Sequence, residues 1–323
     1  QAAEQPVHIS PHHRADEHPG TLRLRAAVLR FIVWRLVGAI PTMLAVCAVV
    51  FLIIRVVPGD PASVILGDQA TPEALSALRA RLGIDRPLPV QFLAFISDVA
   101  TLDFGVSLVS GKPIGEEIAR VLPYTFELTV AALLFAVVVG VPLGVMAASA
   151  PNGLADVVTR LVSLVGVSFP AFISGILILL LFAIQLGWFP VISDGQGGTL
   201  AERAHSLVLP AFSLGLIMAA YVTRSTRSAM LSVLGEDYIR TARSKGIGRR
   251  SVIWRHGLRN AAIPVTTIVG LYLGTLLGNS VLTEIVFSRP GLGKLILGAV
   301  SQRDYTMLQS LMVVFSFCVV LAN

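Results

Sequence analysis

The sequence predicts an all-α protein that crosses a membrane about six times. Hydrophobic residues make up 54% of the chain and charged residues only 14%, whereas a soluble domain carries about 25% charged residues. The apolar residues also gather in runs of about 20, the length that a helix needs to cross a bilayer. This composition excludes a disordered chain, a nucleic-acid-binding domain and most water-exposed enzymes.

The apolar runs give the order of the expected elements. We expect spanning helices over residues 36–57, 128–149, 161–186, 204–223, 260–283 and 305–323. Residues 1–29 then form a tail and residues 30–323 a membrane domain, with a long loop at 58–123 and a basic loop at 224–260.

The distribution of lysine and arginine predicts how the chain is oriented. If the N-terminus lies inside, the inner segments hold 15 basic residues and the two short outer loops hold 4. Because basic residues are enriched in cytoplasmic loops, we expect both termini to be cytoplasmic and the loop 58–123 to lie outside. The polar tail is longer than that of a secretory signal peptide, so the first apolar run is expected to remain as an anchor.

The cysteines and histidines predict neither a disulfide nor a metal site. Cys47 and Cys318 each lie in an apolar run, where a free cysteine behaves as a small buried hydrophobic residue. A nickel or zinc site in the tail is an alternative, but a stable site needs ligands that are fixed in space. The histidines concerned are His8, His12, His13 and His18.

The loop 58–123 is expected to contain a short helix outside the membrane. Thr71 is a favourable N-cap, and Pro72 suits the first helical position. Gly83 is a favourable residue to end the helix. Residues 58–61, which contain two prolines and a glycine, are expected to form a turn after the first span.

The sequence contains no complete catalytic motif. Residues 105–113 differ from a phosphate-binding loop by one extra residue and by a proline in place of the Mg²⁺-binding hydroxyl. Residues 166–170 lack the last glycine of a nucleophile elbow. We therefore expect no catalytic residue. Glu127 and Glu284 lie near the ends of spans, where they are candidates for a substrate path or for an interfacial position.

The basic loop is the most informative segment. Its spacing predicts two short amphipathic helices with a glycine break at Gly246 and Gly248. One apolar face is expected to hold Tyr238, Ile239, Ala242 and Ile247. Such a face needs a protein cleft or a lipid surface, and anionic lipid is the alternative explanation for the positive charge.

This loop resembles the EAA loop of permease subunits of bacterial ABC importers, in particular those of the dipeptide/oligopeptide/nickel permease family. The resemblance covers nearly the whole chain from about Arg35, although only Ala242 matches the alanines of the general EAA pattern. The residues that carry it are Arg35, Leu36, Ile40, Pro41, 57–61 (VPGDP), 82–88 (LGIDRPL), 103–107 (DFGVS), 236–246 (EDYIRTARSKG), 256–260 (HGLRN), Thr283, Glu284, Phe287, 290–293 (PGLG) and 303–305 (RDY).

The resemblance implies the type I ABC importer permease fold in a bacterial inner membrane. Besides lipid, it implies three kinds of protein partner and no nucleic acid: a second homologous permease, two ATP-binding subunits and an extracytoplasmic substrate-binding protein. ATP and Mg²⁺ would be held by the ATP-binding subunits, with no cofactor in this chain. The residues expected to couple the chain to the ATPases are Glu236, Asp237, Tyr238, Ala242, Arg243, Lys245, Gly246 and Ile247.

The substrate is less well determined than the class of protein. The resemblance favours dipeptides or oligopeptides, with nickel, glutathione or another small solute as alternatives. Three other classes remain as alternatives: a non-transporting membrane scaffold, a secondary transporter and an intramembrane hydrolase. A secondary transporter would often contain an internal repeat, and a hydrolase would need paired catalytic side chains within the membrane. The sequence offers neither feature.

Overall fold

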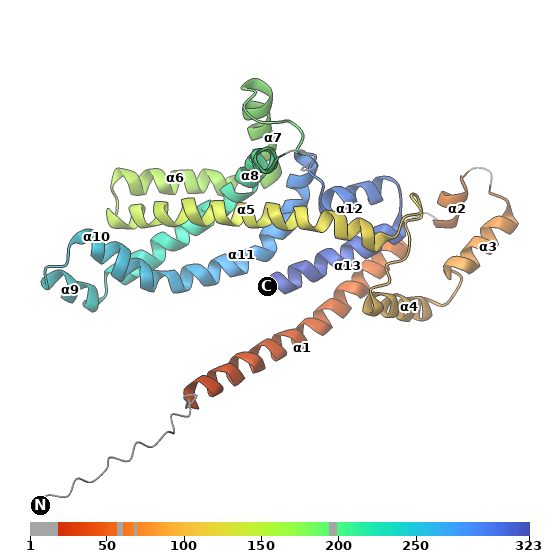
Figure 1. The fold of residues 1–323 in the computed structure, drawn as a ribbon, viewed down its shortest axis with the longest axis horizontal. Coiled ribbons are helices and arrows are strands. Elements are labelled where there is room, and N and C mark those ends of the chain that lie inside the picture. The colour runs from red at the N-terminus through yellow and green to blue at the C-terminus, as the bar shows by residue number, and fades with distance from the viewer. Residues whose placement is uncertain (1–18, 57–60, 68–69, 194–198) are drawn as a thin grey trace, which may run out of the picture. The chain divides into compact units, whose positions relative to one another are not determined.

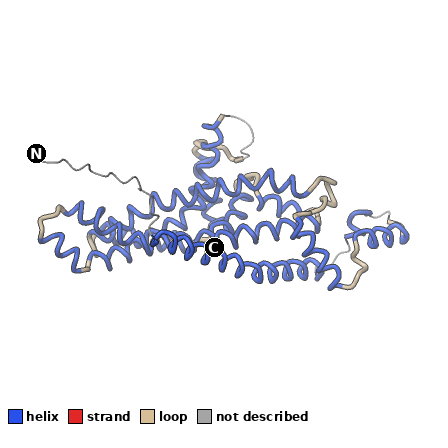
Figure 2. The backbone as a smooth tube through the Cα atoms, turned by 60° about the horizontal axis from the view of Figure 1, so that its bottom comes forward, coloured by secondary structure: helices blue, strands red, loops and turns tan. Residues whose placement is uncertain are grey.

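The computed structural model describes residues 19–56, 61–67, 70–193 and 199–323. Helices make up the regular elements of these residues, and Figure 2 shows them joined by short loops. The chain separates into two units, residues 1–45 and 46–323, and each is considered by itself. The His-containing tail and the predicted turn at Pro58, Gly59 and Asp60 lie outside the described residues.

The elements follow one another along the chain as shown in Figure 1. They are α1 (Pro19–Val56), α2 (Pro61–Leu66), α3 (Pro72–Leu82), α4 (Leu88–Thr101), α5 (Ile114–Ser149), α6 (Leu154–Ser168), α7 (Ala171–Ile178), a π-helical segment (Leu179–Gln185), α8 (Leu200–Leu234), α9 (Asp237–Ser244), α10 (Arg249–Ser251), a second π-helical segment (Val252–Gly257), α11 (Leu258–Val286), α12 (Leu292–Ser301) and α13 (Tyr305–Ala322).

The all-helical fold is confirmed, with five helices in the described residues that are long and apolar enough to cross a membrane. They lie at Leu29–Val56, Ile114–Ser149, Leu200–Leu234, Arg249–Val286 and Tyr305–Ala322. Several extend beyond the expected spans. α5 begins at Ile114 instead of residue 128, so the last part of the loop 58–123 is helical, and α8 continues to Leu234 instead of ending at residue 223.

The expected span over residues 161–186 is wrong as one continuous helix. α6 ends at Ser168, Phe169 has an extended backbone with φ −100° and ψ 134°, and α7 begins after Pro170. Proline disfavours a helical conformation in the residue before it and cannot donate the hydrogen bond that would continue the helix. In Figure 1, α7 turns away from the direction of α6 at this break.

The core of the unit 46–323 lies where α5 packs along α8. At three glycines the backbones approach closely: a Cβ atom added to Gly144 would lie 2.6 Å from the Cβ of Thr226, and one added to Gly215 would lie 2.7 Å from the carbonyl oxygen of Ala132. Gly140 packs in the same way against Val222. Small residues allow this approach between helices in a membrane, where packing replaces the hydrophobic effect as the main attraction.

Two local predictions are confirmed in this unit. α3 has Thr71 as its N-cap, whose side chain accepts a hydrogen bond from the backbone N–H of Ala74 at 3.2 Å, and Gly83 ends it with φ +68°. Cys47 and Cys318 are free and buried. α12, which precedes α13, was not predicted by the sequence.

Candidate functional site

The basic loop is shorter than the sequence predicts, because its first residues belong to α8 and its last residues belong to α11. It comprises residues 235–257 and contains α9, the break at Gly246, α10 and the second π-helical segment. Gly246 has φ +77°, and its N–H donates to the carbonyl of Arg243 at 2.9 Å. The N–H of Ile247 donates to the carbonyl of Ala242 at 3.2 Å. Only glycine adopts this backbone without strain.

The apolar face of α9 packs within the chain itself. Ile239 is 0% exposed and Ala242 is 7% exposed, and both lie against Val252 in a small core that also contains Leu234 and Ile247. This placement changes the role expected for Ala242. Its methyl group is used inside the subunit and is not available as an apolar contact for a partner.

Tyr238 does not share the buried face with Ile239. It is exposed, and its hydroxyl accepts a hydrogen bond from Nδ2 of Asn260 at 2.7 Å. The bond joins the start of α9 to the start of α11. Tyr238 therefore lies on the outside of the loop, at the point where the loop meets a spanning helix.

The outer surface of the loop is charged and open. Six of the residues expected to couple the chain to its ATPases are exposed, and Ile247 is partly buried. Besides Tyr238, the exposed residues are Glu236, Asp237, Arg243, Lys245 and Gly246. Among the residues that the structure describes, no atom lies within 4 Å of a Cβ built on Gly246. This part of the loop can therefore receive another molecule without rearrangement.

Two arginines connect this end of the molecule to the helices. Nη2 of Arg249 donates to the backbone carbonyl of Ser149, the last residue of α5, at 2.7 Å. Arg227 in α8 donates from Nε and Nη2 to the two carboxylate oxygens of Asp156, at 2.5 and 2.8 Å. Asp156 is fully buried and also accepts from the N–H of Asn152 at 2.9 Å. The sequence analysis missed this pair, because an acid in the first turn of a helix is normally exposed.

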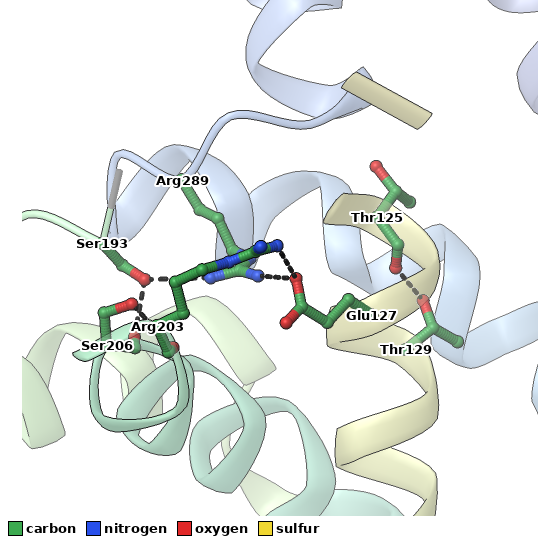
Figure 3. Close-up of polar contacts among 7 residues, drawn as sticks. All are labelled: Thr125, Glu127, Thr129, Ser193, Arg203, Ser206 and Arg289. Carbon is green, nitrogen blue, oxygen red and sulfur yellow. Dashed lines mark hydrogen bonds and ion pairs between the residues drawn. The ribbon is translucent and has the colours of Figure 1, made fainter. Parts of the chain in front are cut away.

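A second polar cluster surrounds Arg289, as Figure 3 shows. Arg289 is only 1% exposed, and its Nη2 donates to Oε2 of Glu127 at 2.7 Å. Its Nη1 donates to Oγ of Ser193 at 3.2 Å, and Ser193 in turn donates to the carbonyl of Ser206 at 2.6 Å. Nη2 of Arg203 lies 4.0 Å from the same oxygen of Glu127. The cluster thus joins α5, the start of α8 and the turn after α11.

Burial controls the electrostatics of this cluster. Loss of water around Arg289 lowers the pKa of its guanidinium from the ordinary value, while the Glu127 and Glu284 carboxylates act in the opposite direction. The carboxylates thereby compensate for part of the cost of burying a cation. Glu127 keeps 35% of its side chain exposed, so it remains accessible.

Glu284 is closed off, which changes the expectation that it lines a substrate path. It is 0% exposed, and its Oε2 accepts a hydrogen bond from the N–H of Gly293 at 2.7 Å. Gly291 covers the carboxylate so closely that a Cβ atom there would clash with it. Next to it, Thr125 accepts from the N–H of Leu292 at 2.9 Å. Glu284 therefore holds the turn between α11 and α12 in place.

Among the residues that the structure describes, histidine, cysteine and acidic side chains form no group of three or more that could hold a metal ion.

The chain is similar to known membrane components of transport systems. Residues 140–323 match the family model "Binding-protein-dependent transport system inner membrane component", and residues 28–129 match the model of the N-terminal part of such components. Two relatives carry the name "Glutathione transport system permease protein GsiC". The protein of Salmonella choleraesuis (strain SC-B67) is 42% identical over 297 residues, and that of Escherichia coli (strain K12) is 40% identical over 296 residues. Each alignment covers 92% of this chain and 94% of the relative.

Proposed function

Because this chain belongs to the family of binding-protein-dependent transport system inner membrane components, we propose that it imports a small peptide, with glutathione as the first candidate. The chain is the permease of an ABC importer and crosses the inner membrane several times. It is not itself the ATPase, and transport depends on an ATPase and a binding protein. The scaffold, secondary transporter and hydrolase alternatives are thereby set aside.

The choice of glutathione changes the order of the substrates expected from the sequence. Dipeptides or oligopeptides were the first expectation and glutathione an alternative, but the relatives named above are glutathione permeases at 40–42% identity. Glutathione is a tripeptide, so both expectations share one chemical class. We therefore propose a peptide of two or three residues and rank nickel and other solutes below it.

The observation that carries the mechanism is the open, charged surface of the basic loop around Gly246. We propose that this surface docks into a groove on an ATPase subunit. The loop then lies in the cytoplasm, as do both termini, and a second permease of the same family completes the membrane path. Arg243 and Lys245 are exposed and can pair with acids at the rim of such a groove.

The contacts of the loop suggest how its movement reaches the membrane helices. Ile239 and Ala242 fix α9 to the end of α8, Arg249 holds the end of α5, and Tyr238 accepts from Asn260 of α11. When ATP closes the ATPases, α9 is drawn along and the spanning helices turn as rigid bodies. The free energy comes from ATP in the partner subunits.

The substrate is tested with the complete complex in proteoliposomes that contain ATP. We expect ATP-dependent uptake of labelled glutathione when the binding protein is added, and weaker uptake of dialanine. Uptake of dialanine but not glutathione would restore the first expectation. Uptake of nickel alone, or of none of the three, would contradict a peptide substrate.

The docking surface is tested by Gly246→Leu. The side chain fits into open space within the subunit but obstructs the approach of a partner, so we expect ATP hydrolysis to continue while uptake falls at least about tenfold. Gly111→Leu is the matched control, because Gly111 also has a positive φ, +68°, with no atom within 4 Å of a built Cβ. It carries the same backbone strain outside the loop. Equal uptake by both variants at equal expression would contradict the docking role.

A further inference from the structure

α8 carries an arginine that neither the transport machinery described above nor the packing of the chain employs. The sequence placed Arg224 in the basic loop, but α8 continues to Leu234, so this residue lies inside the helix. On either side of it, Thr223 and Thr226 pack against Gly144 of α5, a helix that ends at Ser149. Arg224 is thus level with the last apolar turns of α5. A charge at this depth is costly and marks a functional site by default.

Arg227, three residues further along, shows what a structural arginine looks like in the same helix. Its guanidinium is paired with the buried carboxylate of Asp156 through two hydrogen bonds. Arg224 is exposed, and within the described part of the chain no carboxylate lies within ion-pair distance of it. The fold therefore neutralises one of these two cations and leaves the other open.

The guanidinium of Arg224 lies over an aromatic ring of its own helix. Its Cζ atom lies 5.4 Å from the centroid of the Tyr221 ring, which is one turn closer to the N-terminal end of the helix. Contact with an aromatic ring stabilises the cation by cation–π attraction.

The ring under Arg224 borders a cavity between α7, α8 and α11. Tyr221 stacks on Tyr272 of α11 with ring centroids 4.6 Å apart. The cavity has a volume of about 130 Å³, and its polar lining comes from these two tyrosines together with Thr275 and Asn279. Four polar side chains along spanning helices indicate a surface that meets a polar solute rather than lipid. The volume suits one end of a peptide rather than a whole peptide.

We propose that Arg224 receives a carboxylate group of the transported peptide, with Tyr221 and Tyr272 as the walls of this subsite. This inference rests on the proposed function, because it takes the solute to be a peptide. A guanidinium pairs with a carboxylate through two parallel hydrogen bonds, and the pair is stronger where water is scarce. The remaining sides of the guanidinium are free to form these bonds because no carboxylate of the described chain occupies them.

The test compares glutathione with its diamide, in which both carboxylates are uncharged. Uptake of each is measured in proteoliposomes with the complete complex, for the unmodified permease and for Arg224→Gln. Because the binding protein is the same in both, its own preference cancels when the ratios of acid to amide uptake are compared. We expect Arg224→Gln to lower uptake of glutathione about tenfold or more and uptake of the diamide much less. Arg224→Lys keeps the positive charge but cannot form the two parallel hydrogen bonds of a guanidinium, so its glutathione uptake is expected to lie between that of the unmodified permease and that of Arg224→Gln.

A matched control variant tests whether a change in the ratio of acid to amide uptake is specific to Arg224. Arg35→Gln removes another guanidinium that lies over an aromatic ring, that of Phe31 at 5.7 Å, in a different helix. It should leave the acid-to-amide ratio unchanged. Tyr221→Phe, which keeps the ring below Arg224, should retain more glutathione uptake than Arg224→Gln.

Each other outcome contradicts the inference in a recognisable way. An equal loss of acid and amide uptake in Arg224→Gln would indicate that Arg224 binds lipid phosphate. Loss of the second permease on purification would indicate that it pairs with that subunit instead, and unchanged uptake would remove its role altogether. If the unmodified complex imports no peptide, the proposed function itself is contradicted. That result comes from the unmodified complex alone and is therefore distinct from any result for Arg224→Gln.

Discussion

The basic loop and the segment 284–293 are both short, charged and rich in glycine, yet they use these residues in opposite ways. Glu236, Asp237 and Lys245 of the basic loop are exposed, whereas Glu284 and Arg289 are 0% and 1% exposed. The same residue types therefore serve two purposes. Exposed charges remain solvated and free for a partner, while buried charges must be satisfied within the chain and so fix the elements around them.

The glycines show the same difference. Gly246 needs its positive φ but has no atom within 4 Å of a built Cβ, whereas a Cβ on Gly293 would lie 2.5 Å from the Cα of Val281. The first glycine provides a turn in open space, and the second allows two backbones to touch. Substitutions at the two segments should therefore affect different properties: docking in the basic loop, and stability at 284–293.

The largest loss of stability is expected for Glu127→Leu. It leaves the guanidinium of Arg289, which is almost completely buried, without its carboxylate partner, and breaking such a pair from one side costs roughly 3–5 kcal/mol. The measurement is thermal unfolding of the purified permease in detergent. The double variant Glu127→Leu with Arg289→Leu should recover part of the loss, because the unpaired guanidinium is removed while the buried Glu284 loses the nearby charge of Arg289. An unchanged unfolding temperature for the single variant would mean that the pair does not support the fold.

A smaller loss is expected for Gly293→Ala. The new methyl group meets the backbone of Val281, and overpacking of this kind costs about 1–3 kcal/mol. Gly298→Ala, in the same helix but with no atom within 4 Å, is the control and should be neutral or stabilising by about 0.5–1 kcal/mol. Equal unfolding temperatures for the two variants would contradict close packing between α11 and α12.

The smallest effect on stability is expected in the basic loop, for Asp237→Asn. The carboxylate lies 3.3 Å from Arg240 with 93% of its side chain exposed, and such surface pairs contribute little. We expect no measurable change in unfolding temperature but a reduced ratio of peptide imported to ATP hydrolysed. A clear loss of stability without any change in this ratio would contradict the role of the basic loop in docking and would instead give it the structural role proposed for residues 284–293.

The comparison also shows which parts could be predicted from the sequence. The helical character of the apolar runs, the N-cap at Thr71 and the glycine that ends α3 at Gly83 depend on neighbours a few residues away, so these features were predicted correctly. Pro170 offered a local signal for the break between α6 and α7, but the long apolar run around it predicted one span. The continuation of α8 past residue 223 had no local signal, because serine, threonine and arginine suit a loop as well as a helix that packs on α5.

The sequence by itself determined that the chain is an all-helical membrane protein with a basic loop and a glycine break, because hydropathy and backbone preference act over a few residues. Only the tertiary structure decided what each charge does. Arg224 and Arg227 are three residues apart in one helix, but α6 brings Asp156 to Arg227 and leaves Arg224 exposed over the ring of Tyr221. Burial and pairing depend on residues distant in the chain, and packing alone brings those residues together.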